Sequence, residues 1–232
     1  MMNAEEKAAW LNARAGKLTA SRMADAMAFL KNGQPAGARI KLLHELLAER
    51  LTGESVRHVV TDAMLWGMEH EDEAVDYFVH VVTDAMLWGM EREDEAVDYF
   101  VARYSRTVRR SRFYEHPTIE NFGATPDREI GHDGLIEVKC PTTTRYLEWV
   151  IAGVVPEEHK PQMCAQLLCT GKKWVGFMAY DPRIRDENKR LFMRKYEPTQ
   201  DELERVEIAA VKFLNDLDEM FDRFVTTPAQ AA

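Results

Sequence analysis

The sequence predicts an α/β (α+β) fold in which a β-sheet is packed between helices, and two observations carry this prediction. Segments with helical spacing occupy the first hundred residues and return after residue 143, while strand-like runs gather between residues 106 and 140. The 232 residues, 46% of them hydrophobic, are enough to bury one core. We therefore expect a single domain over residues 1–232.

The elements can be placed in chain order. Helical spacing covers residues 4–13, 19–30 and 39–51. Thr19 or Ser21 is placed to cap the second of these helices, and Gly53 ends the third. Further along, the pattern predicts strands over 106–115, 118–124, 134–140, 174–181 and 190–197, and helices over 144–152, 157–169 and from about 199.

A 22-residue segment occurs twice in tandem. Residues 58–79 read HVVTDAMLWGMEHEDEAVDYFV, and residues 80–101 differ from them only by Arg92 in place of His70. Solenoid folds usually need three or more repeats, so two near-identical copies indicate a duplication inside the domain.

The net charge of -9 is unusual for a protein that contacts phosphates. The second repeat copy carries six acidic residues against one arginine, so the duplication explains much of the acidity. Basic residues concentrate in two segments, 103–112 and 183–195. These segments are either ordinary solvated surface or part of a locally basic cleft that contacts DNA.

Other features exclude several classes of protein. Cys140, Cys164 and Cys169 lack metal-like spacing and are too few for a disulfide framework or a four-cysteine iron–sulfur cluster, so we expect reduced thiols. No apolar run approaches the roughly 20 residues that cross a bilayer, and the first residues do not resemble a signal peptide. We expect a cytoplasmic protein without membrane contact.

The most informative segment is ATPDREIGHDGLIEVKCP, residues 124–141. On a strand, Glu137 and Lys139 project to one side while Val138 points into the core. The turn GHDG can fold this strand back beside Asp127. Two carboxylates and an ammonium group would then meet, a set that suits phosphodiester hydrolysis with Mg²⁺. The alternative is a simple hairpin with a surface Glu–Lys pair.

Several motifs resemble, in the same order, those of the phage lambda exonuclease and YqaJ-type viral recombinase family, within the PD-(D/E)XK nuclease superfamily. They are WLNARAGKLTASRM at 10–23, WGMExE in each repeat copy, TPD…IEVKCP, QMCAQLLCTG and FMAYDPR. The resemblance covers about residues 10 to 200. It implies a restriction-endonuclease-like core, with a central mixed β-sheet flanked by helices.

The resemblance also implies residue roles. Asp127, Glu137 and the Val138 carbonyl would hold Mg²⁺, as two ions, with Mn²⁺ as a substitute, and Lys139 would stand beside the attacking water. Gln162 matches a glutamine near the active site. The glutamate of WG-x₃-E is Glu93 or Glu71, and Glu93 is favoured because the second copy runs directly into the active-site strands.

Further residues match a pocket for the DNA 5′-phosphate: Arg14 and Ser21, with Thr125 where a serine is usual. Read without the resemblance, Ser21 is a helix cap and Arg14 a surface charge. Arg145 would touch the DNA backbone. Two departures stand out: Cys164 replaces the family's second helix glutamine, and an acidic residue expected ten positions before Asp127 is absent. His116, near that point, is either a metal ligand or part of a turn.

The resemblance implies a 5′→3′ double-stranded DNA exonuclease of phage-type recombination, in a bacterial host cell. Such an enzyme releases mononucleotides and leaves 3′ single strands. It would bind DNA ends, form a homotrimer and work with a single-strand annealing protein. Two alternatives remain: a DNA-end-binding module inactivated by the duplication, and a structure-specific or restriction endonuclease on the same core.

Overall fold

The computed structural model describes residues 13–55 and 92–227, and these contain two β-sheets. The larger sheet has five strands in the order β2-β5-β6-β7-β8. Three of its strand pairs are antiparallel, and β6 runs parallel to β7, so the sheet is mixed as expected. Its strands are β2 (Val108–Arg110), β5 (Arg128–Ile130), β6 (Gly134–Lys139), β7 (Trp174–Tyr180) and β8 (Leu191–Tyr196).

The smaller sheet places the N-terminal segment beside the chain that leads into the active-site strands. Its order is β1 (Leu18–Thr19), β4 (Phe122–Ala124) and β3 (Tyr114–Glu115). β1 pairs parallel to β4, with Leu18 opposite Phe122 and Thr19 opposite Gly123. Residues more than a hundred positions apart in the sequence therefore lie side by side.

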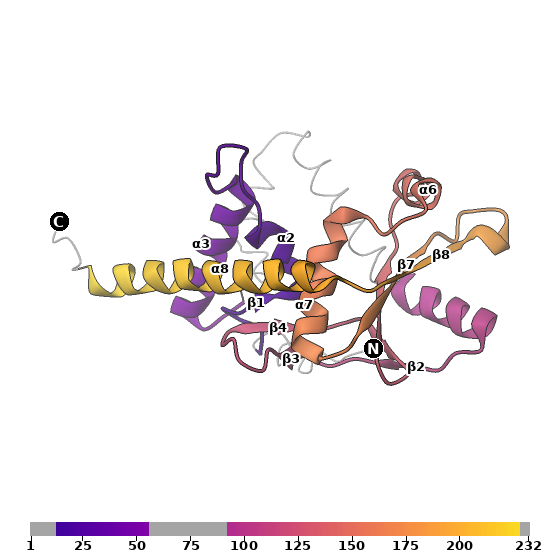
Figure 1. Ribbon diagram of the computed structural model, residues 1–232, viewed down its shortest axis with the longest axis horizontal. Coiled ribbons are helices and arrows are strands. Elements are labelled where there is room, and N and C mark those ends of the chain that lie inside the picture. The colour runs from indigo at the N-terminus through magenta and orange to yellow at the C-terminus, as the bar shows by residue number, and fades with distance from the viewer. Residues whose placement is uncertain (1–12, 56–91, 228–232) are drawn as a thin grey trace, which may run out of the picture.

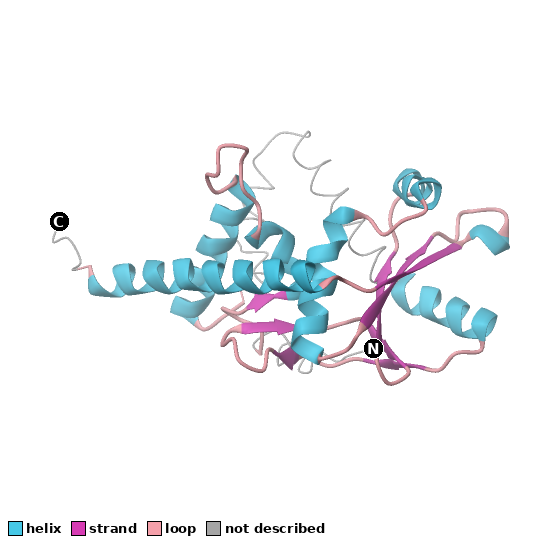
Figure 2. Cartoon of the chain, in the orientation of Figure 1, coloured by secondary structure: helices cyan, strands magenta, loops and turns pink. Residues whose placement is uncertain are grey.

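Helices cover both faces of the larger sheet (Figures 1 and 2). Capping residues mark several of the helix ends. Gly53, Gly153 and Gly171 end three helices in the left-handed conformation, and Thr199 with Glu202 forms a capping box at the start of a fourth. The longer helices are α3 (Gly37–Thr52), α6 (Thr143–Ala152), α7 (Lys160–Thr170), α8 (Gln200–Thr226) and an unlabelled helix over 92–104, magenta in Figure 1. The shorter ones are η1 (Ala20–Arg22), α2 (Met23–Ala26), η3 (Glu157–His159) and η4 (Glu187–Lys189).

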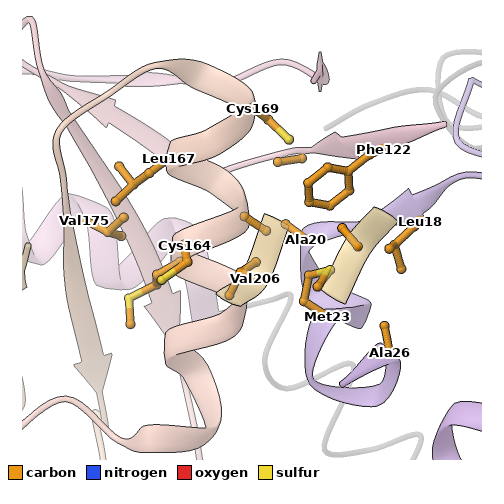
Figure 3. Packing of buried hydrophobic residues seen from close by; sticks show 14 of the residues in the cluster. Leu18, Ala20, Met23, Ala26, Phe122, Cys164, Leu167, Cys169, Val175 and Val206 are labelled. Carbon is orange, nitrogen blue, oxygen red and sulfur yellow. The ribbon is translucent and has the colours of Figure 1, made fainter. Parts of the chain in front are cut away.

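Two apolar clusters divide the core between the faces of the sheet. On one face Leu135 and Phe177 pack with residues of α7 and α8. Helix α7 also packs against Met23 of the N-terminal segment and Phe122 of β4 (Figure 3). On the other face Ile136 and Val138 pack with residues from the helix over 92–104. The side chains of β6 thus alternate between two buried faces, as the strand periodicity predicts.

Four sequence predictions differ from the structure. The strand expected over 118–124 is reduced to β4, because bends and a turn occupy residues 117–121. The helix expected over 19–30 is reduced to η1 and α2, because Leu18 and Thr19 pair with β4, and Thr19 makes no side-chain capping bond. The run over 106–115 splits into β2 and β3, since its ends pair with different sheets. β5 was not predicted; its three residues are too few for a periodic signal.

The cysteine prediction is confirmed, while the N-terminal helix and the first repeat copy fall on residues outside the described ranges. The three cysteines are free, with Cys164 and Cys169 buried. No helix in the described part of the chain is both long and apolar enough to cross a membrane. The helix predicted over 4–13 lies almost wholly outside the described residues, as does the first repeat copy.

Candidate active site

The hairpin of β5 and β6 brings Asp127 and Glu137 together. Arg128 pairs with Ile136 across this hairpin, so Asp127 lies opposite Glu137. The Asp127 Oδ2 atom accepts a hydrogen bond of 2.7 Å from the backbone N–H of Val138. Desolvation of Asp127 and the nearby charges of Glu137 and Glu93 raise its pKa well above the usual range.

Lys139 joins this pair from the same face of β6. Its Nζ lies 2.5 Å from Glu137 Oε1. Burial disfavours the charged form of Lys139, but the attraction of Glu137, Asp127 and Glu93 outweighs it, so the pKa of this ammonium group is raised. The structure therefore brings together the two carboxylates and the lysine that the sequence singled out.

Helix α7 supplies two glutamines to Glu137. Gln162 Nε2 donates to Glu137 Oε1 at 2.6 Å, and Gln166 Nε2 donates to Oε2 at 2.5 Å. Gln162 was predicted at the site, and Gln166 was missed. The sequence contained a signal for Gln166, because it lies four residues after Gln162 and residues i and i+4 share one face of a helix. Cys164, at the position of the expected second glutamine, instead lies 3.4 Å from the Tyr196 hydroxyl.

Glu93, from the second repeat copy, lies at the start of the helix over 92–104. Its Oε1 accepts a 2.6 Å hydrogen bond from Arg128, a buried residue that the sequence reading also missed. Glu93 lies close enough to raise the pKa values of Asp127 and Lys139. The second copy thus places its glutamate beside the catalytic candidates. Glu71, in the first copy, lies outside the described residues.

The donor set fits a hard divalent cation. Asp127 and Glu137 repel each other in a partly desolvated site, and a bound cation would relieve this repulsion. Among the described residues, no three His, Cys, Asp or Glu side chains lie close enough together to form a complete metal site. Val138, the predicted carbonyl ligand, lies between Glu137 and Lys139 on β6.

The candidate phosphate residues gather near the smaller sheet. Ser21 Oγ lies 3.3 Å from Thr19 Oγ1, and the parallel pairing of β1 with β4 directs this turn toward Thr125. The Thr125 hydroxyl is buried and has no hydrogen-bond partner among the described residues. Arg14 stands over the ring of Phe113 at 6.0 Å. A buried hydroxyl without a partner two residues before Asp127 suits an incoming ligand oxygen.

Two other predicted residues have structural partners. His116 Nδ1 accepts from the backbone N–H groups of Thr118 and Ile119, and its ring stacks on Phe122 at 5.5 Å. These are the contacts of a turn residue. Arg145 pairs with Glu148 at 2.7 Å and with Glu158, although half of its side chain is exposed.

A family model for the YqaJ-like viral recombinase domain matches residues 9–173, so the chain belongs to this family. The same fold occurs in an alkaline exonuclease (LHK-Exo) from Laribacter hongkongensis, with 31% identity and a TM-score of 0.75, covering 93% of this chain and 95% of that one. The same exonuclease in complex with dAMP matches equally well.

A phage-related exonuclease from Haemophilus somnus 129PT shares the fold at 11% identity and a TM-score of 0.59, covering 90% of this chain and 96% of that one. A search of curated proteins found no match. Family membership and the similarity to LHK-Exo over nearly the whole chain place the protein among the phage-type exonucleases, as the sequence motifs predicted.

Proposed function

We propose that the protein is a Mg²⁺-dependent exonuclease that degrades one strand of duplex DNA from its 5′ end, releasing mononucleotides and leaving 3′ single strands. The observation that carries this proposal is the convergence of Asp127, Glu137 and Lys139 at the β5–β6 hairpin. These groups are partly or fully buried, although a Glu–Lys pair with no function would be more stable in water.

Each residue has a distinct part in the proposed reaction. Asp127, Glu137, Glu93 and the Val138 carbonyl would hold the metal, with two ions expected and Mn²⁺ as a substitute. Bound there, the metal would stabilise charge on the scissile phosphate and activate water. Lys139 would orient the attacking water. Gln162 and Gln166 would keep the Glu137 carboxylate in one orientation. His116 is left out of the ligand set because turn amides occupy its Nδ1.

The end of the DNA would be held by Arg14, Ser21 and Thr125. A guanidinium group and two hydroxyls suit a terminal phosphate, since arginine offers a planar fork of donors. Recognition of the 5′-phosphate would set the direction of digestion. Arg145, half-exposed on the helix after β6, would contact the DNA backbone after releasing Glu148 or Glu158.

The proposal extends to assembly and setting. We infer a homotrimer that works with a single-strand annealing protein in the cytoplasm of a bacterial host, encoded by a phage or prophage. Family membership supports this inference.

Digestion of linear duplex DNA tests the function directly. Wild-type protein with Mg²⁺ should release mononucleotides, faster from 5′-phosphate than from 5′-hydroxyl ends, and EDTA should abolish release. Lys139→Ala should lower the rate by about 100-fold or more, because the water loses its positioning group. Arg14→Ala should remove the preference for 5′-phosphate ends.

Other outcomes would favour the alternatives. Binding of DNA ends without release of nucleotides at any metal concentration would contradict the nuclease and support an end-binding module. Cleavage of closed circular DNA would support an endonuclease, because such DNA has no end to recognise.

A further inference from the structure

Arg128 is a buried arginine beside the active site. Only 7% of its side chain is exposed. It follows Asp127 in the sequence and lies on β5 opposite Ile136, so its side chain lies on the sheet face that the helix over 92–104 covers. A buried guanidinium group is costly unless paired and hydrogen-bonded.

Three acceptors satisfy Arg128. Its Nη1 donates to Glu93 Oε1 and to the Asp127 carbonyl oxygen, each at 2.6 Å, and its Nη2 donates to Asp94 Oδ1 at 2.5 Å. One side chain therefore ties the start of the helix over 92–104 to the backbone of the catalytic aspartate. We name Arg128 with Glu93 and Asp94 the arginine clamp.

The clamp engages only one oxygen of Glu93. Among the described residues, Oε1 bonds to Arg128, and no hydrogen bond is recorded at Oε2. Glu93 is one-third exposed, and its Oε1 shares Arg128 Nη1 with the carbonyl oxygen of Asp127. A carboxylate fixed through one oxygen can offer the other to a cation, as outer-shell partners commonly fix metal ligands.

We propose that Arg128 is a positioning residue that holds the Glu93 carboxylate at the metal site. This inference rests on the proposed function. Glu71 and Asp72 repeat the Glu93–Asp94 pair in sequence, so residue type alone does not distinguish the copies. Within the described residues, the clamp joins Arg128 to the second copy, through Glu93 and Asp94.

Arg110 provides a matched control. It also ties this helix to the sheet, through bonds of 2.9 and 2.7 Å to both oxygens of Asp94, but it makes no bond to Glu93. Arg110 is 64% exposed and Arg128 only 7%, so loss of Arg110 should cost less stability. If the clamp only docked the helix, loss of either arginine would lower stability without changing metal binding. If Arg128 positions Glu93, only its loss changes metal binding.

The test is Arg128→Lys, which keeps the charge but cannot reproduce the planar fork. The Mg²⁺ concentration for half-maximal DNA digestion should rise by about tenfold or more. The Mn²⁺ dissociation constant from calorimetry, measured without DNA, should rise likewise. Arg110→Gln should leave both values within about twofold of wild type. In a Glu93→Gln background, Arg128→Lys should add almost nothing to the change in Mn²⁺ affinity, because Arg128 affects the metal site through Glu93.

The electrostatic alternative predicts the opposite pattern. If Arg128 acted only through its charge, Arg128→Lys would match wild type and Arg128→Gln would bind Mn²⁺ more tightly, since a repelling cation is gone. Either result overturns the proposal, as would independent effects of Arg128→Lys and Glu93→Gln. Should Arg128→Lys fail to fold, Asp94→Asn should show a smaller change in the same direction and Asp72→Asn none.

The proposed function can fail separately. A wild-type protein that binds Mn²⁺ but never digests DNA would contradict the nuclease, while the calorimetric comparison would still decide the role of Arg128.

Discussion

At the scale of single residues, Glu137 is the most constrained group of the site: it is only 1% exposed, and three side chains donate hydrogen bonds to its carboxylate. Lys139 and Gln162 donate to one of its oxygens and Gln166 to the other. Charge-assisted bonds of this kind offset the desolvation of a buried carboxylate and fix its plane. The glutamines therefore prepare Glu137 for a ligand without adding charge to the site.

Gln166→Met should expose this contribution. The variant keeps the side-chain length but leaves Glu137 Oε2 without its donor, so the free energy of unfolding in EDTA should fall by about 1–3 kcal/mol. Digestion should slow by about 10- to 100-fold, as for other outer-shell partners. Denaturant unfolding and single-turnover digestion measure the two effects.

Cys164→Ala is the control for Gln166→Met. Cys164 is equally buried on α7 but contacts Tyr196, so its loss should alter stability and leave the digestion rate unchanged. Equal activity of wild type and Gln166→Met would show that Gln166 is not needed to orient Glu137.

Much of this site was predictable residue by residue, but its supporting residues were not. The alternation of β6 fixes which side Glu137 and Lys139 share, and one turn then determines that Asp127 lies opposite. Arg128 and Gln166 escaped prediction because their roles depend on which face of a neighbouring element each meets. That information comes from packing between elements, which local spacing does not contain.

At the scale of elements, the strong periodic segments were predictable and the short pairings were not. α3 and α6 begin and end within two residues of their predicted bounds, and α8 begins within two residues of its predicted start, because caps and glycines mark these positions. β1 and β5, of two and three residues, exist because other strands pair with them. The phosphate residues and the hairpin both depend on these short strands.

The helix over 92–104 brings Glu93 to the active site, so the two repeat copies should differ in their sensitivity to mutation. Glu93→Ala should lower the digestion rate by about 10- to 100-fold, because the metal site loses a carboxylate. Glu71→Ala should digest DNA at nearly the wild-type rate, although it removes the same residue from a sequence context that differs at one position, His70 for Arg92. Initial rates at saturating Mg²⁺ measure both, and full activity in the Glu93 variant would assign the catalytic glutamate to the first copy.

At the scale of the whole molecule, the acidic charge and the nuclease fold can be reconciled. Residues 58–101 contain a large share of the acidic side chains, whereas the candidate phosphate and backbone contacts, Arg14 and Arg145, lie outside the repeat. Association with DNA depends on fields within about 10 Å at ordinary ionic strength, so the net charge does not decide binding.

Deletion of either repeat copy should leave a working enzyme. Removing residues 58–79 or residues 80–101 yields two chains that differ at one position, which is arginine in the first and histidine in the second. Either chain keeps one WG-x₃-E glutamate with the same spacing to Asp127, so both should digest DNA at similar rates. Arginine at this position pairs with Glu95 at 2.5 Å in the full chain, a half-exposed contact worth about 0.2–1 kcal/mol. The chain that keeps Arg92 should therefore be slightly more stable to denaturant, and a large difference in activity between the two chains would mean that Arg92 itself acts at the site.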